Sequence, residues 1–186
     1  MPLSAPAPRE PLHTRCIRCQ GYRRADGWWD IEAHLTDTKS YAFTNHDRGT
    51  IEAGEPVHEM WLRVTVDDDL VIREVEAHTD HGPHHICPEI TPNYRALAGL
   101  KIGPGWQRQV HARVGGVAGC THLRELLAPV ATTAFQTITP IKVRERGLTS
   151  PAVERAPTLL GTCHAYAPSS PVVARLWPQH YTGKPT

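Results

Sequence analysis

The chain has 186 residues, a formal net charge of +1 and 40% hydrophobic residues. This length and apolar content suit one domain with a substantial core. The near-neutral charge, without a long stripe of Lys and Arg, argues against a nucleic-acid partner. No apolar run is long enough to cross a bilayer, and the Pro/Ala-rich residues 1–10 lack the apolar centre of a signal peptide. We therefore expect a cytoplasmic protein with neither a nucleic-acid nor a membrane partner.

Five cysteines and twelve histidines are the unusual part of the composition. An odd number of cysteines without a leader peptide argues against a disulfide framework, so we expect reduced thiols. The histidine content is high for this length. Together they direct attention to thiol and imidazole chemistry.

Taken in chain order, residues 1–11 predict a disordered arm. Alternating apolar and polar positions then predict four strands, at residues 12–24, 28–41, 57–67 and 70–79. A polar loop is expected at 45–56. The run of aspartates at 67–69 is a tight turn, so the last two strands form a hairpin. In the fourth strand, alternation places Glu76 on the same face as Leu70 and Ile72.

The pattern then changes to helices. A loop dense in histidine and proline covers 78–92, and short helices are expected at 93–100 and after the glycine turn at 103–105. The strongest helix runs over 120–138, with Pro129 interrupting it. A polar linker at 142–157, a C-terminal piece at 159–177 and a loose tail at 178–186 complete the chain. Strands followed by helices predict an α+β fold, with an antiparallel sheet of about four strands and helices packed on one face, as a single domain over 12–177.

The segment Gly119–Leu123 places a thiol and an imidazole at the start of the strongest helix. Free backbone N–H groups and the helix dipole favour a thiolate or an anion there. Thiolate and imidazole are also ligands that zinc prefers. The candidate ligands for zinc, or for another divalent transition metal, are Cys87, Cys120, His122, Cys163 and His164. The alternative is that Cys120 packs under the helix while His122 caps it.

A second candidate pair is His58 with Glu76, expected on neighbouring strands of the hairpin. A titratable group among apolar neighbours is costly unless it is paired, and such burial raises the pKa of a carboxyl toward the range useful for proton transfer. The catalytic candidates are therefore His58, Glu76, Cys120 and His122. The alternative is a hydrogen-bonded core pair. The histidine-rich loop at 78–85 is either a metal-binding loop or an exposed neutral one.

Several segments resemble an uncharacterised bacterial family, the domain-of-unknown-function family twenty-eight eighty-nine. They are Gly21–Glu32, Lys39–Tyr41, Gly54–Leu62, Glu76–Ala77, Cys87–Pro88, Gly119–Leu123, Glu125–Leu126, Ala134–Gln136 and Cys163–Ala165. The resemblance spans about residues 12–177. It implies that these segments belong to one domain, and it implies no activity.

A weaker likeness is architectural. A hairpin, a cysteine-bearing loop, a short helix and a cysteine at the start of a long helix are similar to the NifU/SufE-like iron–sulfur scaffold proteins. Cys87 and Cys120 are the matching positions. The likeness implies bound zinc or a nascent cluster, although histidines stand where the scaffold has its first cysteine motif.

The leading hypothesis is a small metal-dependent or acid–base enzyme, of the lyase or hydrolase class, that acts on a small organic molecule. An aromatic substrate would suit an apolar pocket lined by Trp28, Trp29, Trp61, Tyr94 and Trp106. The alternative is a metal- or iron–sulfur-binding accessory or scaffold protein without its own turnover, with a client protein as partner. A third hypothesis is a ligand-binding module whose cysteines are structural. A hydrophobic edge strand would support a homodimer, and no organic cofactor is expected.

Overall fold

The computed structural model describes residues 3–147 and 159–183. Contacts gather the chain into two compact units, Met1–Phe135 and Gln136–Thr186. The single domain expected over residues 12–177 overlaps both units and stays a prediction. Within the described ranges, no helix has both the length and the apolar composition that crossing a bilayer requires.

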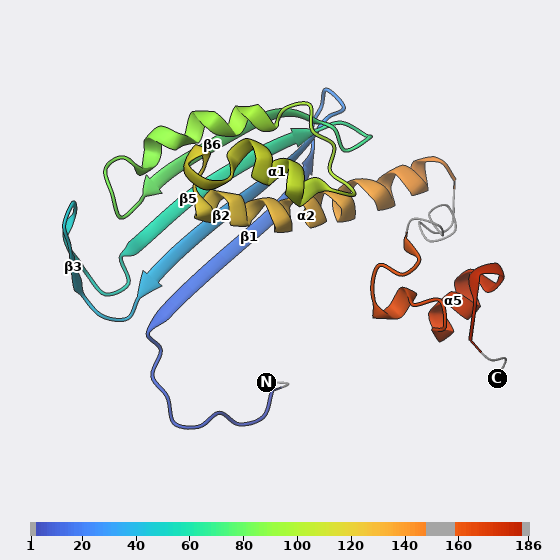
Figure 1. Ribbon diagram of the computed structural model, residues 1–186, viewed down its shortest axis with the longest axis horizontal. Helices are drawn as coiled ribbons and strands as arrows, with labels where there is room; N and C mark the ends of the chain where they lie inside the picture. The colour runs from blue at the N-terminus through green and yellow to red at the C-terminus, as the bar shows by residue number, and fades with distance from the viewer. Residues whose placement is uncertain (1–2, 148–158, 184–186) are drawn as a thin grey trace. The chain divides into compact units, whose positions relative to one another are not determined.

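The first unit is built on a four-stranded antiparallel sheet (Figure 1). Its strands are β1 (His13–Arg23), β2 (Trp29–Lys39), β5 (Pro56–Val66) and β6 (Ile72–His81), in the spatial order β1-β2-β5-β6. These are the four strands that the alternating pattern predicted, with ends that differ by one or two residues. Together with the helices they confirm the α+β class.

The polar loop predicted at 45–56 instead contains part of a small hairpin. Its strands, β3 (Phe43–Asn45) and β4 (Gly49–Ile51), have three residues each. The Asn45 side chain accepts hydrogen bonds from the N–H groups of Asp47 and Arg48, which closes the turn. Strands this short show no readable alternation, so the pattern missed them.

Helices cover one face of the sheet (Figure 1). They are η1 (Cys87–Leu97), α1 (Trp106–Val114), η2 (Gly116–Ala118) and α2 (Thr121–Glu145). α1 follows the glycine turn as expected. η1 begins inside the predicted histidine-rich loop. α2 extends beyond the predicted end at residue 138, and Pro129 lies within it.

The core lies between the sheet and these helices. Alternate side chains of β2 point into it, and the buried series is Trp29, Ile31, Ala33 and Leu35. The helices contribute Tyr94, Leu97, Val110, Leu123, Leu127 and Val130, all fully buried. The next residue in the β2 series is Asp37, which is 1% exposed. A carboxylate therefore occupies a core position at the end of the strand.

A β-bulge in the last hairpin reverses the expected faces of β6. Ile72 pairs with Val66, but Glu74 pairs with Thr65, so Arg73 is an extra residue. Beyond the bulge, Glu76 pairs with Arg63 on the face opposite to the helices. The prediction that Glu76 shares a face with Ile72 is wrong, because one inserted residue moves every following side chain to the other face.

The second unit contains α5 (Pro171–Leu176), with the short turns η3 (His164–Tyr166) and η4 (Pro178–His180). Ser170 caps α5 by accepting the N–H of Val173. Val173 and Trp177 form its small core, against which Leu159, Leu160, Tyr166, Leu176 and Tyr181 pack. η4 falls in the segment predicted to be a loose tail. Most of the predicted polar linker, residues 148–157, lies outside the described residues.

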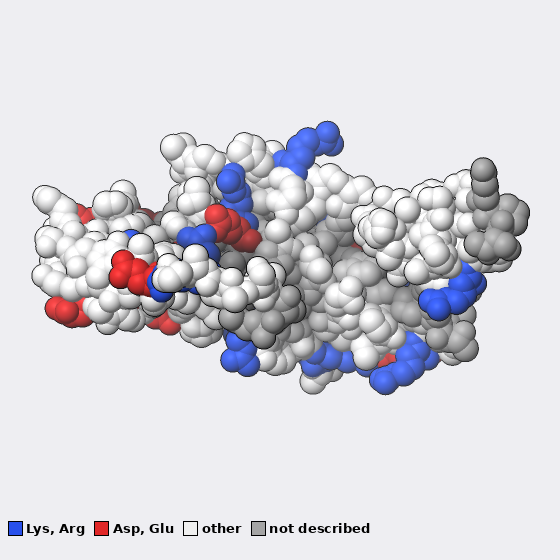
Figure 2. Space-filling model, turned by 90° about the horizontal axis from the view of Figure 1, so that it is seen from below, with Lys and Arg blue, Asp and Glu red and all other residues white. Residues whose placement is uncertain are grey.

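Charges of both signs occur on the face of the molecule that Figure 2 shows. On the face seen in Figure 2, Lys and Arg side chains stand in separate small groups, some beside Asp and Glu, without one continuous basic stripe. This distribution agrees with the formal net charge of +1.

Candidate functional site

Three neighbouring strands bring charged side chains together on the helix-covered face. In the sheet register, Arg15 of β1 is opposite Asp37 of β2, which is opposite His58 of β5. Arg15 binds the Asp37 carboxylate at both oxygens, with Nε to Oδ1 at 2.8 Å and Nη2 to Oδ2 at 2.7 Å. His13 Nε2 lies 3.0 Å from the same Oδ1. Burial would raise the pKa of Asp37, but the hydrogen bonds from Arg15 and His13 outweigh it and hold the pKa at about 2.

The first turn of α2 adds an imidazole and a thiol to this carboxylate. His122 Nε2 lies 4.0 Å from Asp37 Oδ2, and Nδ1 of the same ring lies 3.9 Å from Cys120 Sγ. The His122 ring also stacks on His58, with ring centroids 3.7 Å apart. Asp37, His122 and Cys120 therefore form a line from a buried carboxylate, through an imidazole, to a sulfur.

The Cys120 thiol is held in a setting that favours its ionised form. Cys120 caps α2, since its C=O accepts the N–H of Arg124. Burial would raise the pKa of Cys120, but hydrogen bonds from the His122 ring and from the backbone N–H groups of Leu123 and His122 lower it below its usual value. The hydrogen bond with Cys120 in turn raises the pKa of His122. The two shifts favour a thiolate–imidazolium pair.

His58 has the opposite electrostatic character. Burial, and then the nearby charge of His122, lower the pKa of His58 to about 4. His58 Nδ1 lies 3.1 Å from Asp37 Oδ2. At neutral pH the ring is therefore uncharged and donates a hydrogen bond to the carboxylate while it supports the His122 ring by stacking.

Tyr94 of η1 fixes the backbone of the cysteine. Its hydroxyl accepts the N–H of Cys120 at 3.1 Å and donates to the C=O of Cys120 at 2.9 Å. Burial raises the pKa of Tyr94 to about 12, so the phenol stays neutral and can donate. The sequence analysis named Tyr94 as an aromatic residue of an expected pocket and did not predict this role.

A pocket of about 560 Å³ opens beside the thiol. Its polar wall contains His58, Cys87, Cys120 and His122. The apolar wall is formed by Met60, Pro83, Ile86, Ile90 and Val117. A reactive group beside an apolar cavity is the usual arrangement of a site for a small molecule.

The structure brings together four of the sequence candidates, His58, Cys87, Cys120 and His122, on this one pocket. It does not bring Glu76 to them. Glu76 accepts a hydrogen bond from Arg63 Nη1 at 2.9 Å on the exposed face of the sheet, so a pairing of His58 with Glu76 is excluded. Cys163 and His164 belong to the second unit and are exposed within it. Their proposed part in a metal site stays a prediction.

Two residues of the cluster were missed by the sequence analysis, Asp37 and Arg15. The signal for Asp37 was present, because it continues the buried β2 series that begins at Trp29. Arg15 carried no local signal, since its role depends on pairing with a strand twenty-two residues away in sequence. Arg15 also forms an ion pair with Glu125 of α2, which ties β1 to the helix layer.

One group in the described part of the chain has the donors for a metal ion. Ligand atoms of Asp37, His58 and His122 all lie within 4.8 Å of one another. Two imidazoles and one carboxylate suit zinc or iron with open coordination positions. However, Arg15 already donates to Asp37 Oδ2 at 2.7 Å. Its positive charge opposes a cation at that oxygen.

No curated protein and no solved structure matches the chain. The likeness to NifU/SufE-like scaffolds therefore has no support from a known fold. A family model does match over residues 13–136, a range that contains the whole Arg15, Asp37, His58, Cys120 and His122 cluster. Because the match covers well over half of the chain, the protein belongs to the family described as Protein of unknown function (DUF2889).

Proposed function

We propose that this protein is a thiol-dependent enzyme of the hydrolase class that acts on a small, largely apolar molecule. The supporting observation is the line Cys120–His122–Asp37 beside an apolar pocket. A sulfur nucleophile, a base within reach and a third group that orients the base are the features of nucleophilic catalysis. Between the lyase and hydrolase classes, this set favours hydrolysis.

The proposed reaction has two steps. The Cys120 thiolate attacks the carbonyl carbon of an ester or thioester and forms an acyl–sulfur bond, while His122 gives its proton to the departing alcohol or thiol. His122, now neutral, takes a proton from water, and the resulting hydroxide attacks the acyl carbon. The acid leaves and the thiolate–imidazolium pair is restored.

The remaining residues have positioning roles in this proposal. Asp37, 4.0 Å from His122 Nε2, stabilises the imidazolium and orients the ring. Arg15 keeps Asp37 ionised and in place. Neutral His58 restricts rotation of His122 through the ring stack.

The pocket indicates the kind of substrate. Its apolar wall and its volume of about 560 Å³ suit a small acyl group or an aromatic ring. The five cysteines that the structure describes are free thiols, as the reaction requires for Cys120. A reducing, cytoplasmic location is accordingly part of the proposal.

The test is hydrolysis of p-nitrophenyl acetate, with mass-spectrometric detection of an acetyl group on Cys120. Cys120→Ser should lose the burst of nitrophenol and the adduct. Cys16→Ser is the matched control, because Cys16 is exposed on β1 and should leave both unchanged. Equal activity of Cys120→Ser and the parent protein would disprove the proposal.

A metal-binding accessory role is the second candidate, favoured by the spacing of the donors of Asp37, His58 and His122. Tetrahedral zinc with bonds of about 2.05 Å places its ligand atoms roughly 3.3 Å apart. The distances from Asp37 Oδ2, 3.1 Å to His58 Nδ1 and 4.0 Å to His122 Nε2, lie on either side of that value. Such a protein would have no turnover of its own and would deliver zinc or an iron–sulfur unit to a client protein. A second copy of the chain, in a homodimer, is the alternative partner.

Metal analysis separates the two roles. Protein purified without chelator should contain stoichiometric zinc under the accessory role, and His58→Ala should lose it while Cys163→Ser keeps it. Under the hydrolase role, acyl transfer to Cys120 should persist after treatment with a chelator.

A further inference from the structure

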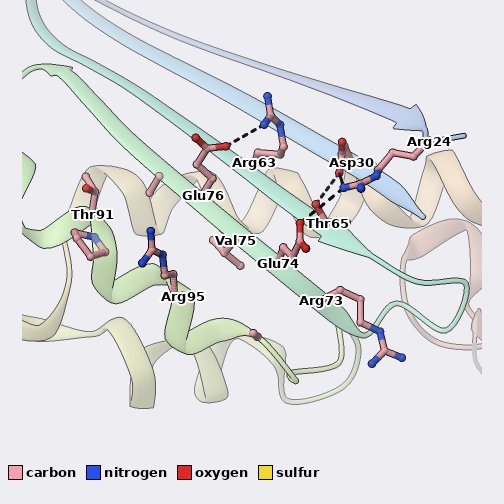
Figure 3. Close-up of a pocket in the computed structure, with 13 residues that line it drawn as sticks. Arg24, Asp30, Arg63, Thr65, Arg73, Glu74, Val75, Glu76, Thr91 and Arg95 are labelled. Atoms are coloured by element: carbon pink, nitrogen blue, oxygen red, sulfur yellow. Dashed lines mark hydrogen bonds and ion pairs between the residues drawn. The ribbon is translucent and has the colours of Figure 1, made fainter. Parts of the chain in front are cut away.

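A second hollow, of about 550 Å³, lies along the free edge of β6 and shares no lining residue with the Cys120 pocket. One wall is formed by charged side chains on the exposed face of the sheet, and the other is formed by η1 (Figure 3). The middle of β6, Val75 and Ala77, lies between the two walls. The acyl-transfer proposal does not use this hollow.

The start of the β6 edge is already paired. Ile72 N–H donates to Leu100 O at 2.8 Å, and Gly99 N–H donates to Ile72 O at 2.8 Å. Ile72, on the core face, therefore turns both of its backbone groups away from β5. In a strand of L-residues, all residues with side chains on one face turn their backbone groups to the same side.

The middle of the edge has no hydrogen-bond partner among the described residues. Val75 and Ala77 pair with Val64 and Leu62 on the core face, so their N–H and C=O groups also point away from β5. Within residues 3–147 and 159–183, no strand or loop supplies hydrogen-bond partners on that side. The hollow thus borders two core-face residues of this strand edge, Val75, which is 8% exposed, and the part-exposed Ala77.

The charges of the hollow are unevenly matched. Its sheet-side carboxylates have partners: Glu76 binds Arg63 at 2.9 Å, and Arg24 lies 3.5 Å from Asp30 and 3.8 Å from Glu74. Arg95, on η1, is exposed and forms no ion pair with any acidic residue that the structure describes. Figure 3 shows Arg95 on the η1 side, across from these paired groups.

We propose that this hollow binds an extended, acidic peptide segment of a partner protein. The segment adds a strand to β6 at Val75 and Ala77 and places a carboxylate against Arg95. Donors and acceptors that alternate along a strand edge are matched by another extended backbone. The unmatched cation selects an acidic residue in that backbone.

Charged side chains on an edge strand often serve only to prevent such pairing. Here Glu74 and Glu76 form their ion pairs with Arg24 and Arg63 on the outer face, as the dashed lines in Figure 3 show. Their carboxylates are therefore held by partners on the outer face, and neither glutamate is paired with Arg95 across the hollow. This arrangement favours an edge that pairs with a partner strand over an edge whose charges prevent such pairing.

The test uses the full chain and a fluorescein-labelled peptide of alternating valine and threonine that ends in glutamate. We expect saturable binding by fluorescence anisotropy. Hydrogen exchange, read by NMR, should slow at the amides of Val75 and Ala77. Arg95→Ala should weaken binding roughly three- to tenfold, as expected for loss of one charge-assisted contact. Arg108→Ala is the matched control, an exposed arginine on α1 outside the hollow, and should bind like the parent protein.

Two altered peptides complete the experiment. Replacing the terminal glutamate with a glutamine amide should weaken binding to the parent protein as much as Arg95→Ala does. N-methylation of alternate backbone amides should abolish binding. The proposal is overturned by equal binding of the acidic and amidated peptides, by tight binding of the N-methylated peptide, by protection at β1 in place of β6, or by an absence of binding.

Discussion

The imidazole rings of His58 and His122 stack with centroids 3.7 Å apart, yet the pKa values of the two rings are shifted in opposite directions. Burial and the charge of His122 lower the pKa of His58 to about 4. The hydrogen bond with Cys120 raises the pKa of His122. Two like rings in contact thus differ in their surroundings: burial favours the neutral form of His58, and the nearby thiol favours the protonated form of His122. Separated pKa values of this kind are typical of sites in which protons are moved.

The first prediction concerns the thiol. Alkylation of Cys120 by iodoacetamide should be fast, and its rate should rise with the fraction of Cys120 that is thiolate. The thiolate forms as the pH rises through a pKa below the usual value for cysteine. His122→Asn removes the partner that lowers this pKa, so the midpoint of the rate profile should move to higher pH. The exposed Cys16 serves as the internal reference. Slow labelling of Cys120 with an ordinary midpoint would contradict the thiolate–imidazolium pair.

The second prediction concerns stability in acid. The pKa of His58 is about 4 in the folded protein and 6.5 in the unfolded chain, so the unfolded state binds more protons between these values. The free energy of unfolding should therefore fall as the pH falls from about 6.5 to 4, by up to roughly 2–3 kcal/mol. Urea unfolding at several pH values measures it.

The control for this prediction is His58→Gln, which cannot titrate and should flatten the pH dependence within that window. Asp37 affects the free energy of unfolding at lower pH, since its pKa is about 2 in the folded protein and 3.8 in the unfolded chain. Its contribution to stability is lost as the pH falls between these values. His122, whose pKa is raised, loses its contribution only as the pH rises. An unchanged slope in His58→Gln would assign the acid sensitivity to other groups.

The parts of the site that the sequence predicted are local in the chain. Cys120 and His122 are two residues apart at a helix start, and a glycine before a periodic apolar run is enough to find them. The alternation over residues 28–41 likewise predicted the strand β2. Arg15 and Asp37 meet only because β1 and β2 pair in one register, and register depends on contacts distant in sequence.

The error at Glu76 has the same origin. The alternation of apolar and polar residues was counted correctly from Ile72, but the bulge at Arg73 adds one residue that no pattern of hydrophobicity marks. A single inserted residue exchanged the two faces of β6. It removed Glu76 from the site and placed it in the ion pairs of the outer face.

The third prediction concerns Tyr94. Tyr94→Phe removes one hydroxyl that satisfies both the N–H and the C=O of Cys120. Unpaired buried backbone groups should cost about 1–3 kcal/mol in unfolding free energy. The start of α2 should also loosen, so the pKa of Cys120 should rise and the rate of alkylation at neutral pH should fall. Tyr41→Phe, at an exposed tyrosine of the same unit, is the control for loss of a hydroxyl.

The last prediction concerns the buried carboxylate. Arg15→Ala removes two hydrogen bonds from Asp37, whose side chain is 1% exposed. The remaining buried negative charge then has hydrogen bonds only with His13 and His58. Breaking a buried pair in this way typically costs about 3–5 kcal/mol. Since Arg15 is itself part-exposed, water offsets some of this cost, and we expect about 2 kcal/mol in urea unfolding.

The matched control is Arg18→Ala, an exposed arginine three residues along the same strand, and it should change stability by less than about 0.5 kcal/mol. The double variant Arg15→Ala with Asp37→Asn should recover part of the loss, because the buried negative charge of Asp37 is then removed as well. Arg15→Ala also removes the charge that opposes a cation at Asp37 Oδ2, so its zinc affinity should rise. A variant as stable as the parent protein, with unchanged zinc affinity, would mean that Arg15 does not control the charge of this site.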